Sequence, residues 1–219
     1  MIITVGGIKG GSGKTTVATN LVVTRSTEGR DVLLVDGDDQ ETSSDFTAVR
    51  GERRAEEGAG YTCIKLSNAA VRTEVLKLKD KFSDIVVDTG GRDTTSQRAA
   101  LSVSDVLLVP FVPRSFDVWT LEQTSSLVEE VRVINPNIRA YMFLSKADSR
   151  GNENEEAREY LSRSPHLTFL DTPLVLRKAY SDAAGKGEGV VEYRPKDDKA
   201  ITEFRRLYDI VFAINNIHI

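Results

Sequence analysis

Short runs of β-branched and aliphatic residues alternate along the chain with longer segments whose apolar positions recur every three or four residues. The first run, residues 2–5, ends at a glycine pair and is typical of a strand buried on both faces. Next, Val17, Leu21 and Val22 fall on one side of a helix predicted over residues 15–25. The same criteria predict further strands at residues 31–36, 84–88, 106–109, 139–144 and 168–170, and further helices at residues 71–82, 119–134 and 197–214.

Polar residues and prolines mark the breaks in this pattern. Residues 50–60 are polar and contain glycine, which indicates a loop or the end of a solvated helix. Pro110 and Pro113 are expected to stop the strand at residues 106–109, because proline cannot donate a ladder hydrogen bond. Strands that alternate with helices predict an α/β fold: one domain over residues 1–219, with a mostly parallel sheet covered by helices on both faces. In such a sheet, functional groups gather at the carboxyl ends of the strands.

The most specific motif follows the first strand directly, where residues 9–16 read KGGSGKTT. The general phosphate-loop pattern, G-x-x-x-x-G-K-S/T, puts its first glycine at position 8; this chain has isoleucine there, so the motif is the deviant form. Glycines let backbone N–H groups converge on phosphate oxygens, and the following helix adds its positive dipole end. Lys14 is expected to neutralise the β- and γ-phosphates, and Thr15 to ligate Mg²⁺. The predicted nucleotide-binding residues of the loop are Lys9, Gly10, Gly11, Ser12, Gly13, Lys14, Thr15 and Thr16.

This loop and the elements around it resemble the ParA/MinD group of deviant-Walker ATPases, and the resemblance covers most of the chain. In that family the lysine that corresponds to Lys9 reaches across a nucleotide-sandwich dimer to the partner's phosphates. Such a lysine would stabilise charge as the γ-phosphate departs, in the manner of an arginine finger supplied in trans. The resemblance therefore implies ATP and Mg²⁺ as cofactors, a homodimer with ATP, and catalytic roles for Lys9 and Lys14.

Acidic residues follow the second predicted strand, where residues 36–40 read DGDDQ and resemble the family's D-x-D-P-Q segment. The resemblance implies that Asp38 orients or activates the attacking water and that Asp36 lies near Mg²⁺ through a water. Asp39 replaces the family's usual proline and adds a third acid to the turn. The alternative is an acidic N-cap cluster for the next helix.

A third strand end, Asp88-Thr89-Gly90-Gly91, looks like the Walker B segment and second switch of the family. In that interpretation Asp88 belongs to the Mg²⁺ shell, and the backbone at Gly91 senses the γ-phosphate. A loop of this kind is ordered by ATP and relaxes after hydrolysis.

The pocket for the base has two interpretations. Residues 145–148, SKAD, resemble the N/T-K-x-D element of GTPases, in which Asp148 would accept hydrogen bonds from guanine. In the ParA group the same strand end lies beside adenine, and ATP is the favoured nucleotide. Residues 172–174 and 177–180 are similar to the family segment that packs on the base and then turns into a helix. Lys146 and Pro173 are accordingly assigned to the nucleotide pocket.

Composition and charge narrow the range of functions. The chain has 29 Lys and Arg against 33 Asp and Glu, a net charge of −4, so contact with DNA would need a local basic patch. With Cys63 as the single cysteine, the chain has no intramolecular disulfide and cannot bridge a four-cysteine cluster as a dimer; Cys63 is interpreted as a small residue in a strand. No apolar run reaches the ~18–20 residues that a membrane span requires, which favours the cytoplasm. The last helix carries apolar residues in a pattern that fits core packing better than membrane binding.

These observations favour a ParA-type ATPase that dimerises on ATP, binds DNA non-specifically and partitions DNA or positions a protein cargo. A ParB-like protein or cargo adaptor would stimulate hydrolysis, and the protein would be nucleoid-associated. Candidate DNA contacts are Lys178, Lys186, Arg194, Lys196, Lys199, Arg205 and Arg206, each of which could equally be a solvated surface residue. Because the sequence begins at the phosphate-loop strand, we expect no N-terminal helix-turn-helix and no operator recognition. The alternatives are a MinD-like membrane-positioning ATPase, a GTP-dependent relative, and a dethiobiotin-synthetase-like ligase with a second pocket facing the γ-phosphate.

Overall fold

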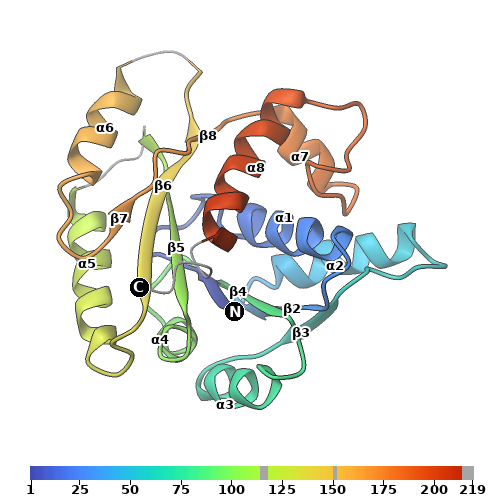
Figure 1. Ribbon diagram of the computed structural model, residues 1–219, viewed down its shortest axis with the longest axis horizontal. Helices are drawn as coiled ribbons and strands as arrows, with labels where there is room; N and C mark the ends of the chain where they lie inside the picture. Colours follow the sequence, from blue (N-terminus) through green and yellow to red (C-terminus); the bar gives the residue numbers. More distant parts are fainter. Residues whose placement is uncertain (114–117, 150–151, 214–219) are drawn as a thin grey trace.

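The computed structural model describes residues 1–113, 118–149 and 152–213, which form a parallel sheet with helices on both of its faces (Figure 1). The strands are β1 (Ile2–Val5), β2 (Val32–Gly37), β3 (Thr62–Lys65), β4 (Asp84–Thr89), β5 (Val106–Phe111), β6 (Arg139–Ala147), β7 (Thr168–Phe169) and β8 (Leu174–Val175). Their order is β3-β2-β4-β1-β5-β6-β7, with β8 also beside β6, and all pairs among the described strands are parallel. The predicted α/β fold is confirmed.

Side chains alternate between the two faces of the sheet, and each face has its own helices. The helices are α1 (Lys14–Thr27), α2 (Thr42–Arg53), α3 (Ala69–Leu78), α4 (Thr95–Leu101), α5 (Val118–Arg132), α6 (Glu153–Leu161), α7 (Lys178–Ala184) and α8 (Asp198–Ala213). On β1, Ile3 and Val5 pack with α1, α7 and α8, whereas Ile2 faces α3 and α4. Helices α5 and α6 cover the same side as α3 and α4, over β5 and β6 (Figure 1). Strands β1, β2, β4 and β5 are therefore buried on both faces, which explains their continuous apolar runs.

Two strands extend well beyond their predicted ends: β6 continues from residue 144 to Ala147, and β5 passes Pro110. Strand β5 continues through Pro110 to Phe111 instead of stopping before the proline. Strand β1 pairs with β5 only as far as Leu108 of β5. Beyond Leu108, β5 pairs only with β6, on its other side. A proline is tolerated where a strand has become an edge.

Three helices were absent from the prediction: α2, α4 and α6. The reason is clearest in α2, whose buried side chains are Ser43, Phe46 and Arg50, so it has no apolar stripe. Its last turn occupies the start of the polar segment 50–60, which agrees with a helix end there but not with a solvated Arg50. Strand β3 contains Cys63, as interpreted from the sequence.

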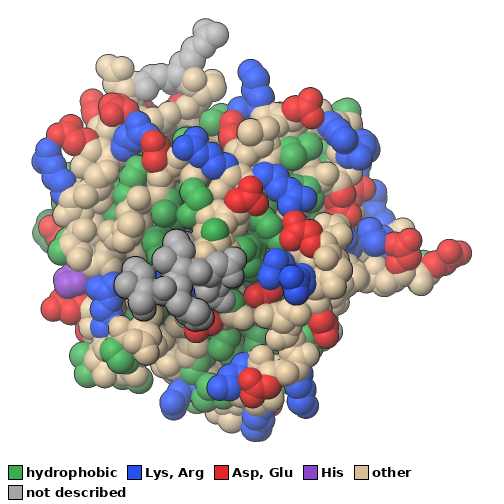
Figure 2. Space-filling model, viewed as in Figure 1, with side chains coloured by type: hydrophobic (Ala, Val, Ile, Leu, Met, Phe, Trp, Pro, Cys, Tyr) green, Lys and Arg blue, Asp and Glu red, His purple; other side chains and the backbone are tan. Residues whose placement is uncertain are grey.

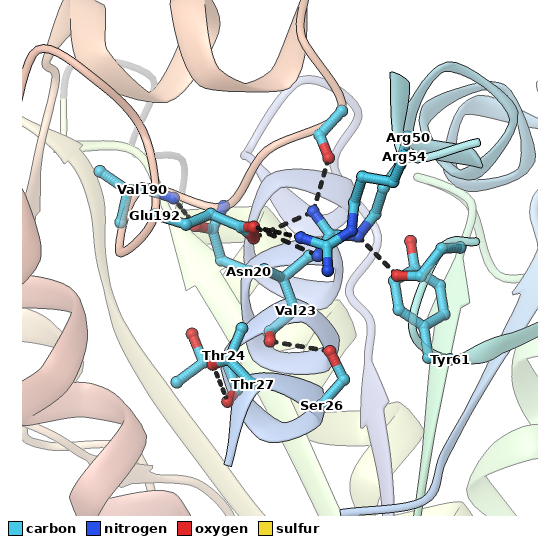
Figure 3. A network of polar contacts seen from close by, with 12 residues as sticks. Asn20, Val23, Thr24, Ser26, Thr27, Arg50, Arg54, Tyr61, Val190 and Glu192 are labelled. Atoms are coloured by element: carbon cyan, nitrogen blue, oxygen red, sulfur yellow. Dashed lines mark hydrogen bonds and ion pairs between the residues drawn. The ribbon is translucent and has the colours of Figure 1, made fainter. Parts of the chain in front are cut away.

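The buried guanidinium of Arg50 fixes α2 to a distant part of the chain (Figure 3). It donates to the Ala59 carbonyl at 2.6 Å, to the Gly187 carbonyl at 2.9 Å and to Glu192 Oε2 at 2.9 Å. The segment 187–192 is also tied to α1, because Val190 N donates to Asn20 Oδ1 at 2.7 Å. We call residues 187–192 the clamp segment. It joins α1, α2 and the α7–α8 connection into one unit.

Helix α8 packs its apolar face on the core, as predicted from its pattern. Phe204, Leu207 and Val211 are buried against α1 and the sheet. On the adjoining side, Tyr208 and Arg205 both donate hydrogen bonds to Glu28 at the end of α1. Of the helices that the structure describes, none combines the length and the apolar character that crossing a bilayer requires.

Candidate nucleotide-binding site

The carboxyl ends of β1, β2, β4 and β6 bring the sequence motifs to the same edge of the sheet. The phosphate loop follows β1, the DGDDQ segment follows β2, Gly90 and Gly91 follow β4, and Lys146 lies at the end of β6. Strands β1, β2 and β4 are neighbours, so the first three motifs converge directly. This is the edge at which parallel α/β sheets bind ligands.

Two loop positions require glycine. Gly11 and Gly13 have φ values of 73° and 96°, a region that side-chain-bearing residues rarely adopt. A Cβ on Gly13 would also lie 2.9 Å from Ser145 Oγ on β6. Helix α1 begins at the next residue, Lys14, so its unpaired N–H groups and positive dipole end lie at the loop.

A polar cavity of about 540 Å³ opens beside the loop. It brings together residues from all four strand ends. Its lining comprises Gly10, Gly11, Gly13, Lys14, Thr15, Thr16, Asp38, Asp39, Gln40, Thr42, Gly90, Gly91, Arg92, Thr94 and Lys146. Glycine backbone, a helix start and a lysine in one cavity are the groups that hold a polyphosphate.

Lys14 is held in place from within the loop. Its side chain is buried, and Nζ donates to the carbonyl of Lys9 at 2.9 Å. Burial lowers the pKa of Lys14, whereas the nearby carboxylates of Asp88 and Asp38 oppose that shift. The ammonium group is thus positioned before any phosphate arrives, which reduces the cost of ordering it on binding.

The three predicted acids have different surroundings. Asp88 is fully buried; its Oδ2 accepts from Ser43 Oγ at 2.5 Å, and its Oδ1 accepts no hydrogen bond from the described residues. Burial raises the pKa of Asp88 to about 6, against the effects of the Ser43 hydrogen bond, the Thr15 hydroxyl and the Lys14 charge. Asp36 is also buried and accepts from Ser44 N and Oγ at 2.8 and 2.7 Å.

Asp38 is the one predicted acid that lines the phosphate cavity; Asp39, beside it, lines the cavity too. Asp38 is half-buried, and its Oδ1 accepts from Gln40 N at 3.2 Å. A carboxylate that borders the cavity and keeps free lone pairs is suited to orient a water molecule next to bound phosphate.

The residues present fit a Mg²⁺ ion held mainly by phosphate and water. Thr15 lines the cavity, and Asp88 Oδ1 is a buried oxygen to which none of the described residues donates a hydrogen bond. Mg²⁺ usually binds through one or two carboxylates plus substrate phosphates and waters, not in a protein cage. In keeping with this, the described part of the chain contains no cluster of three or more His, Cys, Asp or Glu suited to a metal.

The loop after β4 packs directly on the phosphate loop. A Cβ on Gly91 would lie 2.5 Å from the Cα and 2.6 Å from the N of Gly10. A Cβ on Gly90 would lie 3.1 Å from Asp38 Oδ1. The two glycines therefore join the Walker B strand end to the phosphate loop on one side and to the DGDDQ segment on the other.

A second, mainly apolar cavity of about 370 Å³ adjoins the first. Lys146 lines both cavities; its φ is 53°, and its Nζ donates to the Gly11 carbonyl at 2.7 Å. The other lining residues are Gly13, Thr16, Val17, Ser145, Leu174, Val175, Leu176, Arg177, Lys178, Tyr180, Ser181 and Ala184. An apolar slot next to a phosphate site is suited to a planar base.

Two residues assigned to the base from the sequence do not line this cavity. Pro173 precedes the lining segment by one residue, and the cavity wall is formed instead by Leu174 and its successors. Asp148 lies outside the wall, and its backbone N–H and C=O are both hydrogen-bonded to the side chain of Asn154. The geometry gives no support to guanine recognition through Asp148.

Comparison with known proteins agrees with this site. The sequence matches the CobQ/CobB/MinD/ParA nucleotide binding domain over residues 3–190. The chain belongs to this family. It is 26% identical to the Maintenance of carboxysome distribution protein A (McdA) of Halothiobacillus neapolitanus, with 95% of each chain covered. The McdA of Gloeobacter kilaueensis is 30% identical, over 91% of this chain and 88% of the relative.

Solved structures of the CobQ/CobB/MinD/ParA family share the fold. The ATP complex of a McdA variant from Cyanothece superposes with a TM-score of 0.78 at 16% identity, covering 97% of this chain and 96% of that one. Cobyrinic acid a,c-diamide synthase from Mycobacterium smegmatis, with a bound ATP analogue and magnesium, gives a TM-score of 0.77 at 17% identity, covering 96% and 93%. The chain is thus a ParA-like nucleotide-binding protein related to McdA.

Lys9, the additional lysine of the family's deviant loop, does not line the phosphate cavity of its own chain. It is half-buried beside the end of β5, next to Val109 and Phe111. Its carbonyl accepts from Lys14 Nζ and Ser12 Oγ, which fixes the backbone of the loop at this point. Lys9 thus contributes its backbone to the phosphate loop, and it is not among the residues that line the phosphate cavity.

Most of the seven candidate DNA contacts lie around α7 and the segment that follows it, and each has its own local partners. Lys186 Nζ donates to the Arg194 carbonyl at 3.3 Å, and Lys196 and Lys199 line a hollow of about 500 Å³ next to α7. Lys178 is ion-paired with Asp182 on the same helix. Arg205 is paired with Glu28, and Arg206 is exposed elsewhere on α8. Acidic side chains are interspersed with basic ones on this face (Figure 2).

Sequence reasoning missed the residues that hold the motifs in place. Ser43 and Ser44, in the first turn of α2, bind Asp88 and Asp36. Gln97 Oε1, on α4, accepts from Gly7 N at 2.9 Å and from Thr89 Oγ1 at 3.0 Å. Hydroxyl residues shortly after an acidic strand end are a weak signal, and only the tertiary structure gives their partners.

Proposed function

We propose that this protein is a ParA-type ATPase that dimerises on ATP, binds DNA non-specifically and positions a cargo. The observation that carries the proposal is a complete phosphate cavity from whose wall the family's additional lysine, Lys9, is missing. A lysine so placed can act on the phosphates of a second copy. Relatedness to McdA proteins favours a protein assembly as cargo, moved by cycles that an adaptor stimulates.

In this proposal the whole of residues 1–219 acts as one ATPase domain, and each site residue has a defined task. Lys14 and the loop amides bind the β- and γ-phosphates, and Asp38 orients the attacking water. Thr15, Asp36 and Asp88 would hold Mg²⁺, which would supply charge neutralisation at the phosphates when bound. Gly91 transmits the state of the γ-phosphate to the loop after β4.

Mg-ATP is expected to convert the wild type from monomer to dimer, measured by light scattering after size-exclusion chromatography, whereas Mg-ADP and Mg-GTP leave it monomeric. Lys9→Ala should stay monomeric with Mg-ATP, because it lacks the charge that reaches the partner's phosphates. The matched control is Lys77→Ala, a change to an exposed lysine on α3 on the other side of the sheet. A Lys9→Ala protein that dimerises like the control would contradict the proposed role of Lys9.

The ATP-bound dimer is expected to retain duplex DNA of arbitrary sequence, and the double change Lys196→Ala, Lys199→Ala should weaken that retention. Each lost phosphate contact lowers the slope of log affinity against log salt by about 0.9. The control is Lys77→Ala with Lys79→Ala, two exposed lysines on the α3 side. Filter binding over a range of salt concentrations checks the slope. Equal slopes for the two double variants would place the DNA contacts elsewhere.

The alternatives are less well supported by the same geometry. A ligase would need a second, small-molecule pocket, whereas the two cavities at this edge of the sheet have the linings of a phosphate site and a base slot. A MinD-like membrane helix would need a free apolar face, and the apolar face of α8 is buried in the core. We therefore infer a cytoplasmic, nucleoid-associated protein. The filter-binding measurement tests the DNA binding that this location requires.

A further inference from the structure

The carboxylate of Asp88 is held by a residue that no sequence motif includes. Ser43 Oγ donates to Asp88 Oδ2 at 2.5 Å, and both side chains are fully buried. The two residues come from different elements, since Ser43 lies in the first turn of α2 and Asp88 in β4. A hydroxyl carries a single proton, so this donation fixes the orientation of the Ser43 side chain.

The other oxygen of the same carboxylate remains unsatisfied. Asp88 Oδ1 is buried and accepts no hydrogen bond from the described residues. Buried polar atoms nearly always have partners, and a buried oxygen without one is destabilising. Since Ser43 engages Oδ2 alone, the carboxylate cannot rotate to exchange its two oxygens without breaking that bond. Oδ1 is thereby kept available on a carboxyl that Thr15 and Lys14 are close enough to influence.

The geometry points to Ser43 as a positioning residue for Mg²⁺: it holds the Asp88 carboxylate so that Oδ1 serves the ion's ligand shell. Partners of this kind, which orient a ligand from behind, typically affect metal affinity by 10–100-fold. The inference rests on the proposed function, in which Asp88 belongs to the ligand shell of Mg²⁺. It assigns Ser43 no contact with the nucleotide.

The neighbouring serine provides a matched comparison. Ser44 binds Asp36 Oδ2 through both N and Oγ, and Asp38 N donates to Asp36 Oδ1 at 3.3 Å, so Asp36 keeps two hydrogen bonds when the hydroxyl is removed. For Asp88, by contrast, Ser43 makes the one hydrogen bond of ordinary geometry among the described residues, with the Thr15 hydroxyl close by. Ser43→Ala should therefore disturb the position of the Asp88 carboxylate more than Ser44→Ala disturbs that of Asp36.

The test is the Mg²⁺ dependence of nucleotide binding, measured with a fluorescent ATP analogue at increasing Mg²⁺ and, separately, in excess EDTA. In Ser43→Ala we expect the Mg²⁺ concentration for half-maximal binding to rise about 10-fold, with binding in EDTA unchanged. Ser43→Thr, which restores the hydroxyl, should return toward wild type. In an Asp88→Ala background, loss of the Ser43 hydroxyl should cause no further rise, because the two groups act as one unit.

A purely structural bond gives a different pattern. In that case Ser43→Ala would lower the thermal midpoint of the nucleotide-free protein but leave the Mg²⁺ titration where it is in the wild type, which overturns the inference. An additional rise in the Asp88→Ala background would overturn it too. Failure of the proposed function would give a different result: a wild-type protein that neither dimerises with ATP nor hydrolyses it. The Mg²⁺ titration of nucleotide binding would still test the role of Ser43 in such a protein.

Discussion

Replacing Glu192 with glutamine is expected to lower the free energy of unfolding by about 3 kcal/mol. The change removes the charge opposite Arg50, whose guanidinium is only 1% exposed and stays charged in the variant. A buried charge without its partner is among the most costly defects that a single substitution creates. Breaking a buried ion pair usually lowers the free energy of unfolding by about 3–5 kcal/mol. We expect the lower end of this range because the Glu192 side chain is 22% exposed.

Urea unfolding followed by circular dichroism measures this loss, and Glu57→Gln is the matched control. Glu57 is also paired with an arginine, Arg54, but its side chain is 70% exposed. Exposed pairs contribute about 0–1 kcal/mol, so the control should unfold at nearly the wild-type urea concentration. If the two variants are equally stable, Arg50 is not the buried anchor that the clamp segment suggests.

The same anchor explains why the sequence predicted the strands better than the helices. A buried parallel strand has a continuous apolar sequence, and five such strands were predicted from that pattern alone. Helix α2 gives no such signal, because its buried residues include Ser43 and Arg50. The partner that makes Arg50 a core residue lies 142 positions away, at Glu192. Periodicity within one segment cannot reveal a contact of that kind.

The candidate site shows the same difference between residues that a local motif predicts and residues that depend on tertiary contacts. Its phosphate loop is a local motif whose glycines and lysine dictate their own geometry, so the sequence located the cavity residues of that loop from Gly10 to Thr16 except Ser12. It did not locate Thr42 and Thr94, which line the same cavity. The base pocket depends on how the chain after β7 returns to β6, and its wall turned out to be formed from Leu174 onward, with Pro173 just before it. Contacts that tune the motifs, such as Ser43 with Asp88, depend on packing between α2 and the sheet.

Replacing Gly91 with alanine is expected to weaken ATP binding about 10- to 100-fold. A Cβ at this position would lie 2.5 Å from Gly10 Cα, and the atoms it meets are backbone, which cannot rotate away. Overpacking of this kind costs about 1–3 kcal/mol, and 1.4 kcal/mol corresponds to a tenfold change in affinity. The strain falls on the phosphate loop itself, because Gly10 lines the cavity.

Titration with a fluorescent ATP analogue measures the loss, and Gly90→Ala separates this effect from a general disturbance of the turn. A Cβ on Gly90 meets Asp38 Oδ1 at 3.1 Å, the end of a side chain that can move, so Gly90→Ala should bind ATP nearly as well as wild type. Its hydrolysis should nevertheless slow, because Asp38 is displaced from the position in which it orients water. Equal ATP affinities for Gly91→Ala and wild type would mean that the two loops separate when nucleotide binds.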